Sequence, residues 1–387
     1  MISPDQIIYL DNNATTQLDP AVVEEMLPFL TSYYGNPSSS YRFGAQVRAA
    51  VELARERVAA LVGCDAAEIL FTSGGTESNN AAVNSALQLQ PDRRHVVTTA
   101  VEHSATYRHC QDLEKRGYSI SFVAVDGEGH LDVTQLEEAV SAETAIISAM
   151  WANNETGVLF PVEDIGRIAR EKRVLFHTDA VQAAGKLPIR IVASGATSCS
   201  ISAHKLHGPK GVGALYINRR SAFHPMLIGG GQENGHRGGT ENVAAIVGFG
   251  KAAERAMQTM SEEQGRVRAL RDRFENTILA QVPGSFVNGA GSSRLPNTSS
   301  MSFEGIESDA ALMLLDRQNV CCSAGSACLA GSLEPSHVLR AMGLSEERLR
   351  GSLRFSFSRF NTTAEADRAL AVVPSVISKV RGMVPAT

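Results

Sequence analysis

Apolar runs alternate with helical patterns along the chain from about residue 68 to residue 217. The apolar runs predict short strands at residues 69–72, 95–99, 121–125, 145–151, 174–179, 197–203 and 213–217. The segments between them predict helices, among them residues 111–115, 133–140 and 162–172. Because nearly continuous apolar strands that alternate with helices are typical of a parallel sheet covered on both faces, we expect an α/β domain around a mostly parallel sheet.

The pattern changes after a long helical stretch, which is rich in Ala, Glu, Arg and Met and runs from about residue 241 to residue 279. Beyond Pro283-Gly284, short strands at 299–303 and 352–356 mix with helices at 308–317 and 364–380. This change indicates a second, smaller α+β domain. We therefore expect a large domain over residues 15–260 and a small one over residues 1–14 and 261–387.

Composition narrows the class of protein. The chain has 387 residues, of which 43% are hydrophobic and 20% charged, and its net charge of −5 gives no sign of a nucleic-acid partner. No apolar run approaches the roughly 18–20 residues of a membrane span, and the N-terminus has no signal-peptide pattern. Six cysteines without regular spacing indicate a reducing compartment. We expect a cytoplasmic protein without a membrane partner.

A lysine at the end of a predicted strand offers the first chemistry. Lys205 follows the strand 197–203 and precedes a glycine-rich segment, which suits a Schiff base with pyridoxal phosphate, although most lysines in such surroundings are simply solvated. Asp179 ends the preceding strand. Since pyridoxal chemistry needs a carboxylate to keep the pyridine nitrogen protonated, the two residues together indicate a pyridoxal phosphate enzyme.

Three further segments could complete the pocket. Residues 71–80 form a strand, a glycine turn and a helix start, where Thr76 and free N–H groups could bind a phosphate or Thr76 could be an ordinary N-cap. His103 could stack on a cofactor ring and move protons, or be a satisfied histidine at a helix start. The polar run 151–157 follows a predicted strand, where an open α/β sheet places ligand contacts.

The cysteines differ in their surroundings. Cys321 and Cys322 continue a short apolar run and are interpreted as buried small hydrophobic residues, and no paired CxxC motifs support a metal site. Cys328 lies in a stretch of Gly, Ser and Ala with little bulk to bury it, so it is either a nucleophilic thiolate or merely an exposed thiol. The other three are interpreted as structural, namely Cys64, Cys110 and Cys199.

Taken together, these motifs closely resemble the cysteine desulfurases, which are class V, fold-type I pyridoxal phosphate enzymes. The nitrogen-fixation (NifS-type) branch is most similar and the housekeeping (IscS-type) branch next. The matching segments run in family order almost to the end of the chain, at residues 9–16, 35–39, 72–79, 101–103, 150–157, 177–182, 202–213, 237–242, 325–338 and 353–356. The resemblance implies a fold-type I transferase whose large domain holds a mostly parallel seven-stranded sheet.

The resemblance also implies a role for each site residue. Pyridoxal 5'-phosphate would be bound through Lys205, which also moves the substrate α-proton, with His103 stacked on the ring as acid and base. The remaining cofactor contacts would be Asp179 at the pyridinium, Gln182 at the ring hydroxyl, Asn154 nearby, and Gly75, Thr76, Ser202, His204 and a neighbouring subunit's Thr240 at the phosphate. Arg354, with Asn154, would bind the substrate carboxylate.

The implied reaction converts L-cysteine to L-alanine and leaves a persulfide on Cys328. The implied partners are a second subunit in a homodimer and an iron–sulfur scaffold protein that accepts the sulfur, most specifically for nitrogenase clusters. No resident metal is implied, apart from a transient contact of Cys328 with an iron–sulfur cluster. The chain departs from the family pattern at Cys321-Cys322-Ser323-Ala324, where relatives are serine-rich, and at Leu329.

Several alternatives remain at this point. A housekeeping desulfurase or a selenocysteine lyase would use the same cofactor site. An aminotransferase would have no use for Cys328. A non-catalytic scaffold or metal carrier would leave Asp179, Lys205 and Arg354 without a purpose.

Overall fold

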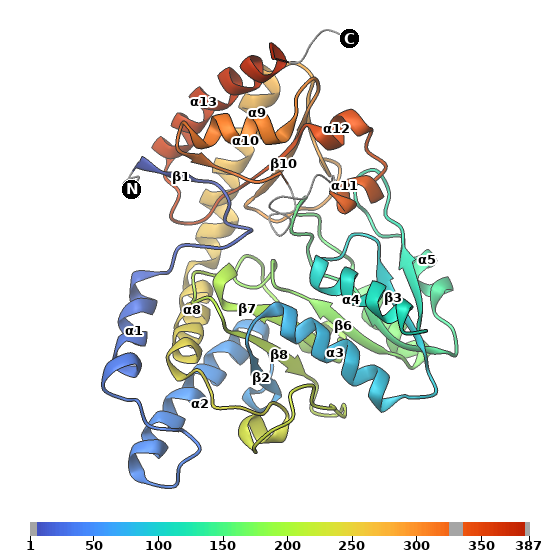
Figure 1. Cartoon of the computed structure of the whole chain (residues 1–387), viewed down its shortest axis with the longest axis vertical. Helices are drawn as coiled ribbons and strands as arrows, with labels where there is room; N and C mark the ends of the chain where they lie inside the picture. The colour runs from blue at the N-terminus through green and yellow to red at the C-terminus, as the bar shows by residue number, and fades with distance from the viewer. Residues whose placement is uncertain (1–5, 325–335, 384–387) are drawn as a thin grey trace.

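The computed structural model describes residues 6–324 and 336–383 of the chain. Figure 1 shows a layered α/β body that contains the large sheet, with α1 and α2 at its far end, and a second group of elements around α9, α10 and α13 at the opposite end. Within these residues, every helix is too short or too polar to cross a membrane.

Seven strands form the large sheet in the order β2-β8-β7-β6-β5-β3-β4. β8 runs antiparallel to both of its neighbours, whereas the other adjacent strands are parallel. The predicted mostly parallel α/β fold is therefore confirmed. The bounds are β2 Ile69–Thr72, β3 His95–Thr99, β4 Ser119–Val123, β5 Thr144–Ser148, β6 Leu175–Asp179, β7 Ser198–Ser202 and β8 Gly213–Ile217.

Four of the seven predicted strands have different bounds in the structure, and two of them, β4 and β5, differ by more than one residue at an end. β4 begins and ends two residues earlier than predicted, because it is an edge strand whose exposed start at Ser119 carries no apolar signal. β5 ends at Ser148 rather than at residue 151. Ala149 and Met150 are nevertheless buried, so the apolar run reports burial beyond the strand rather than further sheet pairing.

Helices cover the sheet, and a main core of buried apolar side chains lies between them and the strands. α2 and α8 pack so closely that a Cβ atom on Gly250 would lie 2.5 Å from Ala54 Cα. The predicted helix 111–115 is longer, because its polar first turn begins at Ser104. The bounds are α1 Pro20–Thr31, α2 Arg42–Val62, α3 Gly75–Leu89, α4 Ser104–Lys115, α5 Val133–Ala139, α6 Val162–Lys172, α7 Ile191–Ser194 and α8 Val243–Glu262, with 3₁₀ turns η2 Ala66–Glu68, η3 Ala203–Lys205 and η4 Gln232–Gly235.

A second core gathers apolar residues from both ends of the chain, since Ile8 and Leu10 pack with side chains from residues 267–380. β12, β10 and β9 form an antiparallel sheet there, and β1 pairs with β11 in parallel. We propose that the chain forms two domains, a large one over residues 15–260 and a small one over residues 1–14 and 261–387. The bounds are β1 Ile8–Tyr9, β9 Ser285–Val287, β10 Thr298–Phe303, β11 Val320–Cys321, β12 Ser352–Ser356, α9 Arg268–Gln281, α10 Ser308–Asp316, α11 His337–Ala341, α12 Glu346–Arg350 and α13 Thr363–Arg381.

The long helical stretch that joins the two cores is not a single α-helix. A π-helical turn at Glu263–Val267 separates α8 from α9, which then continues to Gln281. Val267 packs in the second core, so the turn lies where the chain passes from one core to the other.

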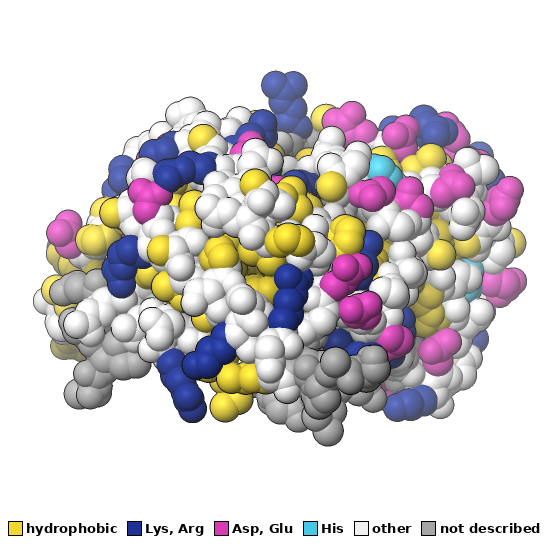
Figure 2. Space-filling model, turned by 90° about the horizontal axis from the view of Figure 1, so that it is seen from above, with side chains coloured by type: hydrophobic (Ala, Val, Ile, Leu, Met, Phe, Trp, Pro, Cys, Tyr) yellow, Lys and Arg dark blue, Asp and Glu magenta, His cyan; other side chains and the backbone are white. Residues whose placement is uncertain are grey.

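Figure 2 shows the molecule from above, from the end where α9, α10 and α13 lie. Lys and Arg side chains are interspersed with Asp and Glu on this face, and the acidic side chains gather to the right of the view.

Candidate active site

A cavity of about 580 Å³ opens at the carboxyl ends of the parallel strands, between the large sheet and β12. This is where open α/β sheets bind ligands. Of the predicted site residues that the structure describes, all but Thr240 line it. Those that line it are Gly75, Thr76, His103, Asn154, Asp179, Gln182, Ser202, His204, Lys205 and Arg354.

Lys205 ends the 3₁₀ turn that follows β7, and this turn directs the lysine away from the sheet into the cavity. Its Nζ donates hydrogen bonds to the backbone oxygens of Asn13 at 2.6 Å and Ala14 at 2.7 Å. Both carbonyls belong to the N-terminal segment, which crosses the cavity from the second core. The N-terminal segment thus supplies two of the hydrogen-bond acceptors around Lys205.

Asp179 is the last residue of β6, and its carboxylate is held in place from two sides. Oδ1 accepts from Val181 N at 2.9 Å, and Oδ2 accepts from Asn79 Nδ2 at 2.7 Å. Asn79 Oδ1 in turn lies 3.0 Å from His177 Nε2. The individual roles of Asn79 and His177 were not predicted, because only the fold brings their partners together.

His103 is the N-cap of α4, where its Nδ1 accepts a hydrogen bond from Ala105 N at 3.1 Å. The proton of the neutral ring is therefore on Nε2. Burial lowers the pKa of His103, and the positive charge of Lys205 acts in the same direction while Asp179 opposes it. The ring is neutral at physiological pH and can exchange a proton at Nε2.

The turn before α3 brings backbone N–H groups to the cavity. Gly74 has a φ of +154°, and a Cβ atom on Gly75 would lie 2.9 Å from Val181 Cγ2, so side chains are excluded from the floor of the turn. Across from it, Ser202 Oγ is buried without a hydrogen-bond partner among the described residues. Burial, followed by the charge of Lys205, lowers the pKa of His204 to about 3. The region thus offers uncharged donors and a helix N-terminus to an anion.

Arg354 is almost fully buried in β12 and reaches the cavity from the second core. Its Nη2 donates to Asp11 Oδ1 at 2.7 Å, and its Nη1 donates to the backbone oxygen of Asn154 at 3.0 Å. Asn154 Oδ1 is buried without a hydrogen-bond partner among the residues that the structure describes. The guanidinium therefore has a fixed orientation that suits a carboxylate ligand.

Thr240 is exposed and does not line this cavity. Its loop is tied down by two ion pairs: Glu233 accepts from both Nη atoms of Arg55 at 2.7 Å, and Arg237 Nε donates to Glu77 Oε1 at 3.0 Å. The expected contact of Thr240 with a neighbouring subunit's phosphate site stays a prediction.

The cysteines are partly as predicted. Cys328 lies outside the described residues, so its placement is still a prediction. Cys321 and Cys322 are only half-buried, and only the first is in a strand, although Cys322 still packs against the second core. Cys110 and Cys199 are buried and Cys64 is half-buried. In the described part of the chain, no group of three or more His, Cys, Asp or Glu could hold a metal ion.

Comparisons with known proteins agree with this geometry. The family model "Aminotransferase class-V" matches residues 8–369. The chain therefore belongs to the class V aminotransferase family, which depends on pyridoxal phosphate.

Its relatives within that family are named cysteine desulfurases. One from Trichormus azollae is 51% identical over 379 residues, which cover 98% of this chain and 95% of that protein. "Cysteine desulfurase NifS" from Azotobacter vinelandii is 49% identical, with 98% and 94% covered. A solved structure of a NifS-like protein superimposes with a TM-score of 0.91 at 37% identity, covering 96% of this chain and all of that one.

Proposed function

We propose that this protein is a cysteine desulfurase that converts L-cysteine to L-alanine and keeps the sulfur as a persulfide on Cys328. The observation that carries the proposal is the convergence of Lys205, Asp179 and Arg354 on one cavity, in a chain about half identical to proteins of that name. Arg354 supplies a carboxylate clamp, which the substrate of such an enzyme requires.

The cavity residues fit pyridoxal phosphate. Ser202 Oγ and Asn154 Oδ1 are buried polar atoms without partners among the described residues, and both face the cavity. The Gly75 cradle leaves room for a group next to the α3 N-terminus, where Thr76 and His204 could hold the phosphate. Asp179 and Gln182 would hold the ring. The bound cofactor would supply an electron sink for cleavage next to the α-carbon.

The protein's own groups would bind the substrate and move its protons. Arg354 would bind the substrate carboxylate with Asn154 beside it. Lys205 Nζ would form the covalent bond to the cofactor and, once displaced by the substrate amine, accept the α-proton. A second proton has to move besides the α-proton. His103 would exchange it through Nε2, since Nδ1 is occupied by the Ala105 N–H.

Sulfur transfer would then require Cys328. Its thiolate would attack the substrate sulfur, so that a bond forms between the two sulfur atoms and the substrate Cβ–S bond breaks. The electron pair of the broken bond would stay with the three-carbon fragment, which takes up protons and leaves as L-alanine. This role is supported by the sequence match of residues 325–338, because Cys328 lies outside the described residues.

We further propose that the protein is a homodimer, in which Thr240 of one subunit contacts the phosphate in the site of the other. We also propose that it works in the cytoplasm. The acceptor would be an iron–sulfur scaffold protein, most specifically one that builds nitrogenase clusters. The identity of 49% to NifS supports the nitrogen-fixation role, and a housekeeping role in cluster assembly is the second candidate.

The test is release of alanine and sulfide from L-cysteine with a reductant, in the wild type and in Cys328→Ala. We expect equal amounts of both products from the wild type and neither from the variant. Cys321→Ala is the matched control and should keep full activity. A Cys328→Ala enzyme that retains activity would overturn the persulfide role, and alanine from selenocysteine alone would indicate a selenocysteine lyase.

A further inference from the structure

A second lysine lies directly behind the cofactor-facing residues. Lys186 is buried, and its Nζ donates to the backbone oxygen of Gln182 at 3.0 Å and to Gln182 Oε1 at 3.4 Å. Gln182 Nε2 donates to the backbone oxygen of Asn13 at 2.9 Å, the same oxygen that accepts from Lys205 Nζ. A continuous line of hydrogen bonds thus connects Lys186 to Lys205 through Gln182 and Asn13.

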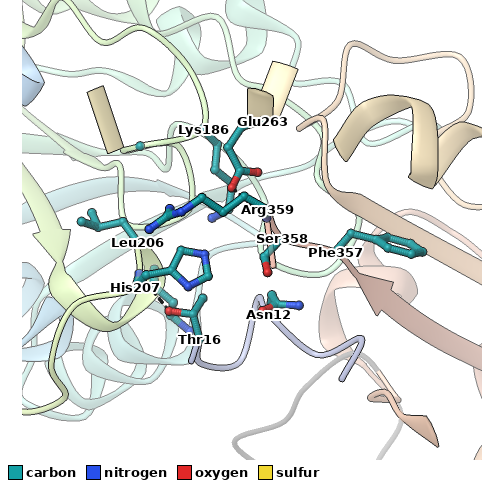
Figure 3. A pocket seen from close by; sticks show the side chains of 11 residues that line it. Asn12, Thr16, Lys186, Leu206, His207, Glu263, Phe357, Ser358 and Arg359 are labelled. Carbon is teal, nitrogen blue, oxygen red and sulfur yellow. Dashed lines mark hydrogen bonds between the residues drawn. The ribbon is translucent and has the colours of Figure 1, made fainter. Parts of the chain in front are cut away.

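The charge of Lys186 has a counterpart across a small cavity of about 10 Å³, which Lys186, Lys205 and Glu263 all line (Figure 3). Glu263 comes from the π-helical turn, and its Oε1 accepts from Arg359 N at 3.2 Å. Its Oε2 is buried without a hydrogen-bond partner among the described residues. A cavity of this size holds about one water molecule, which could bridge the two groups.

Packing alone does not account for an ammonium group at this position. Burial lowers the pKa of Lys186 to about 8, and the charge of Glu263 acts against that shift. A methionine could fill a similar volume without the cost of removing a charge from water. Two interactions of Lys186 could not be replaced by an apolar side chain, namely its donation to Gln182 and its attraction to Glu263.

The donation from Lys186 acts together with the Asn13 carbonyl, which accepts from Nε2, to decide which way the Gln182 amide points. An amide oxygen and an amide nitrogen have the same shape, but an ammonium group can only donate. With Nζ on one side, the amide must present Oε1 to Lys186 and Nε2 to the main cavity. One N–H of Nε2 is used by Asn13, and the other is left for an acceptor on a bound ring.

We propose that Lys186 is a positioning residue, which orients the Gln182 amide toward the cofactor. The negative charge of Glu263 in turn keeps the Lys186 ammonium group in place. This inference rests on the proposed function, because it requires pyridoxal phosphate in the main cavity. Lys186 acts through Gln182 and does not touch the reacting atoms.

The experiment titrates cofactor-free protein with pyridoxal phosphate and follows the visible absorption band, for the wild type, Lys186→Met, Gln182→Ala and the double variant. We expect Lys186→Met to weaken binding roughly tenfold and to move the band, and to lower the thermal midpoint of the cofactor-free chain, because buried Glu263 loses one of its two nearby positive charges. In the Gln182→Ala background, Lys186→Met should add nothing further.

Additive effects of the two substitutions, or wild-type affinity and spectrum in Lys186→Met, would overturn the proposal. Glu263→Gln is a second variant and should weaken binding in the same direction by a smaller factor, which keeps the test available if Lys186→Met does not fold. Lys172→Met, an exposed lysine paired with Glu137, is the matched control. If the wild type shows no visible band that depends on Lys205, the proposed function is overturned as well. If the wild type shows the normal band and Lys186→Met changes neither the affinity nor the band, only the role of Lys186 is overturned.

Discussion

Arg354 and Asp11 form an ion pair inside the candidate active site, with Arg354 Nη2 2.7 Å from Asp11 Oδ1. The arginine comes from β12, and the aspartate from the N-terminal segment, which forms a bridge to the same strand at Ser356. Since the guanidinium is nearly fully buried, the aspartate compensates its charge and holds it in one orientation. The side chain that we propose as the carboxylate clamp is thus oriented by a segment 343 residues away.

Replacement of Asp11 should therefore affect substrate binding more than turnover. We expect Asp11→Ala to raise KM for L-cysteine about tenfold, because loss of a hydrogen bond to a charged group costs about 1.5–3 kcal/mol. Asp11→Asn retains an acceptor oxygen but not the compensating charge, so its KM should lie between those of the wild type and Asp11→Ala. Steady-state kinetics on both variants check this. Equal KM values for Asp11→Ala and the wild type would show that Asp11 does not orient Arg354.

The Glu233 carboxylate should be important for stability. It accepts from both Nη atoms of Arg55 at 2.7 Å and from Phe71 N at 2.8 Å, in a buried setting. We expect Glu233→Gln to lower the free energy of unfolding by about 3–5 kcal/mol, as for other broken buried ion pairs. Glu52 pairs with the same arginine but is 54% exposed, so Glu52→Gln should cost less than about 1 kcal/mol. Urea unfolding of the two variants gives the comparison, and similar losses would contradict it.

His177 should contribute a defined pH dependence to stability. Burial lowers its pKa to about 4, so the folded ring stays neutral where the unfolded ring, at about 6.5, becomes protonated. Below pH 6.5 the unfolded state therefore binds more protons than the folded state. The stability that neutral His177 contributes is lost as the pH falls from 6.5 toward 4, by about 1.4 kcal/mol per pH unit.

The measurement is urea unfolding between pH 4.5 and 6.5 for the wild type and His177→Asn. The free energy of unfolding of the variant should change less steeply with pH, by that amount per pH unit. His204 and His207 also have lowered pKa values, but they are present in both proteins and do not affect the difference. The exposed His236→Asn is the control for removing an imidazole. Identical slopes for wild type and His177→Asn would contradict the assignment.

Asn79 should be required for tight cofactor binding. It donates to Asp179 Oδ2 at 2.7 Å, and without that hydrogen bond only Val181 N, at Oδ1, orients the carboxylate toward the ring nitrogen. We expect Asn79→Ala to weaken pyridoxal phosphate binding about tenfold or more, measured by absorbance titration of the cofactor-free chain. Asn84→Ala, on the same helix with its amide at Met226 Sδ, should bind as the wild type does. Equal affinities for the two variants would contradict this role.

Hydrophobic patterning predicted the seven strands of the large sheet, because nearly all of these strands are buried on both faces and are therefore apolar or small throughout. The residues at the carboxyl ends of β6 and β7, Asp179 and Lys205, could be predicted for the same reason, since a polar side chain directly after a buried strand stands out. Their convergence on one cavity follows from the parallel arrangement of the strands.

Contacts between distant segments could not be predicted in this way. The carbonyls of Asn13 and Ala14 meet Lys205 across more than 190 positions, and a backbone oxygen has no sequence signature. The π-helical turn at Glu263–Val267 lies inside a pattern that indicates one continuous helix, because a single extra residue per turn barely alters the helical period. The side chains that support the site, Asn79, His177 and Lys186, are buried polar groups whose partners only the fold provides.

The π-helical turn has a consequence for how chain length can vary in this protein. A π-helical turn holds about one residue more than an α-helical turn, and one residue in an α-helix corresponds to a rotation of roughly 100°. Deletion of one residue between Glu263 and Val267 would turn the π-helical turn into an α-helical turn, which covers nearly the same rotation about the helix axis with one residue fewer. α9 would then keep its facing, because the π-helical turn already absorbs the extra residue. Deletion of one residue from the regular part of α8 or α9 has no such compensation and would rotate the residues that follow by roughly 100°. The π-helical turn is therefore a position where this chain can lose a residue while the two cores keep their relative orientation.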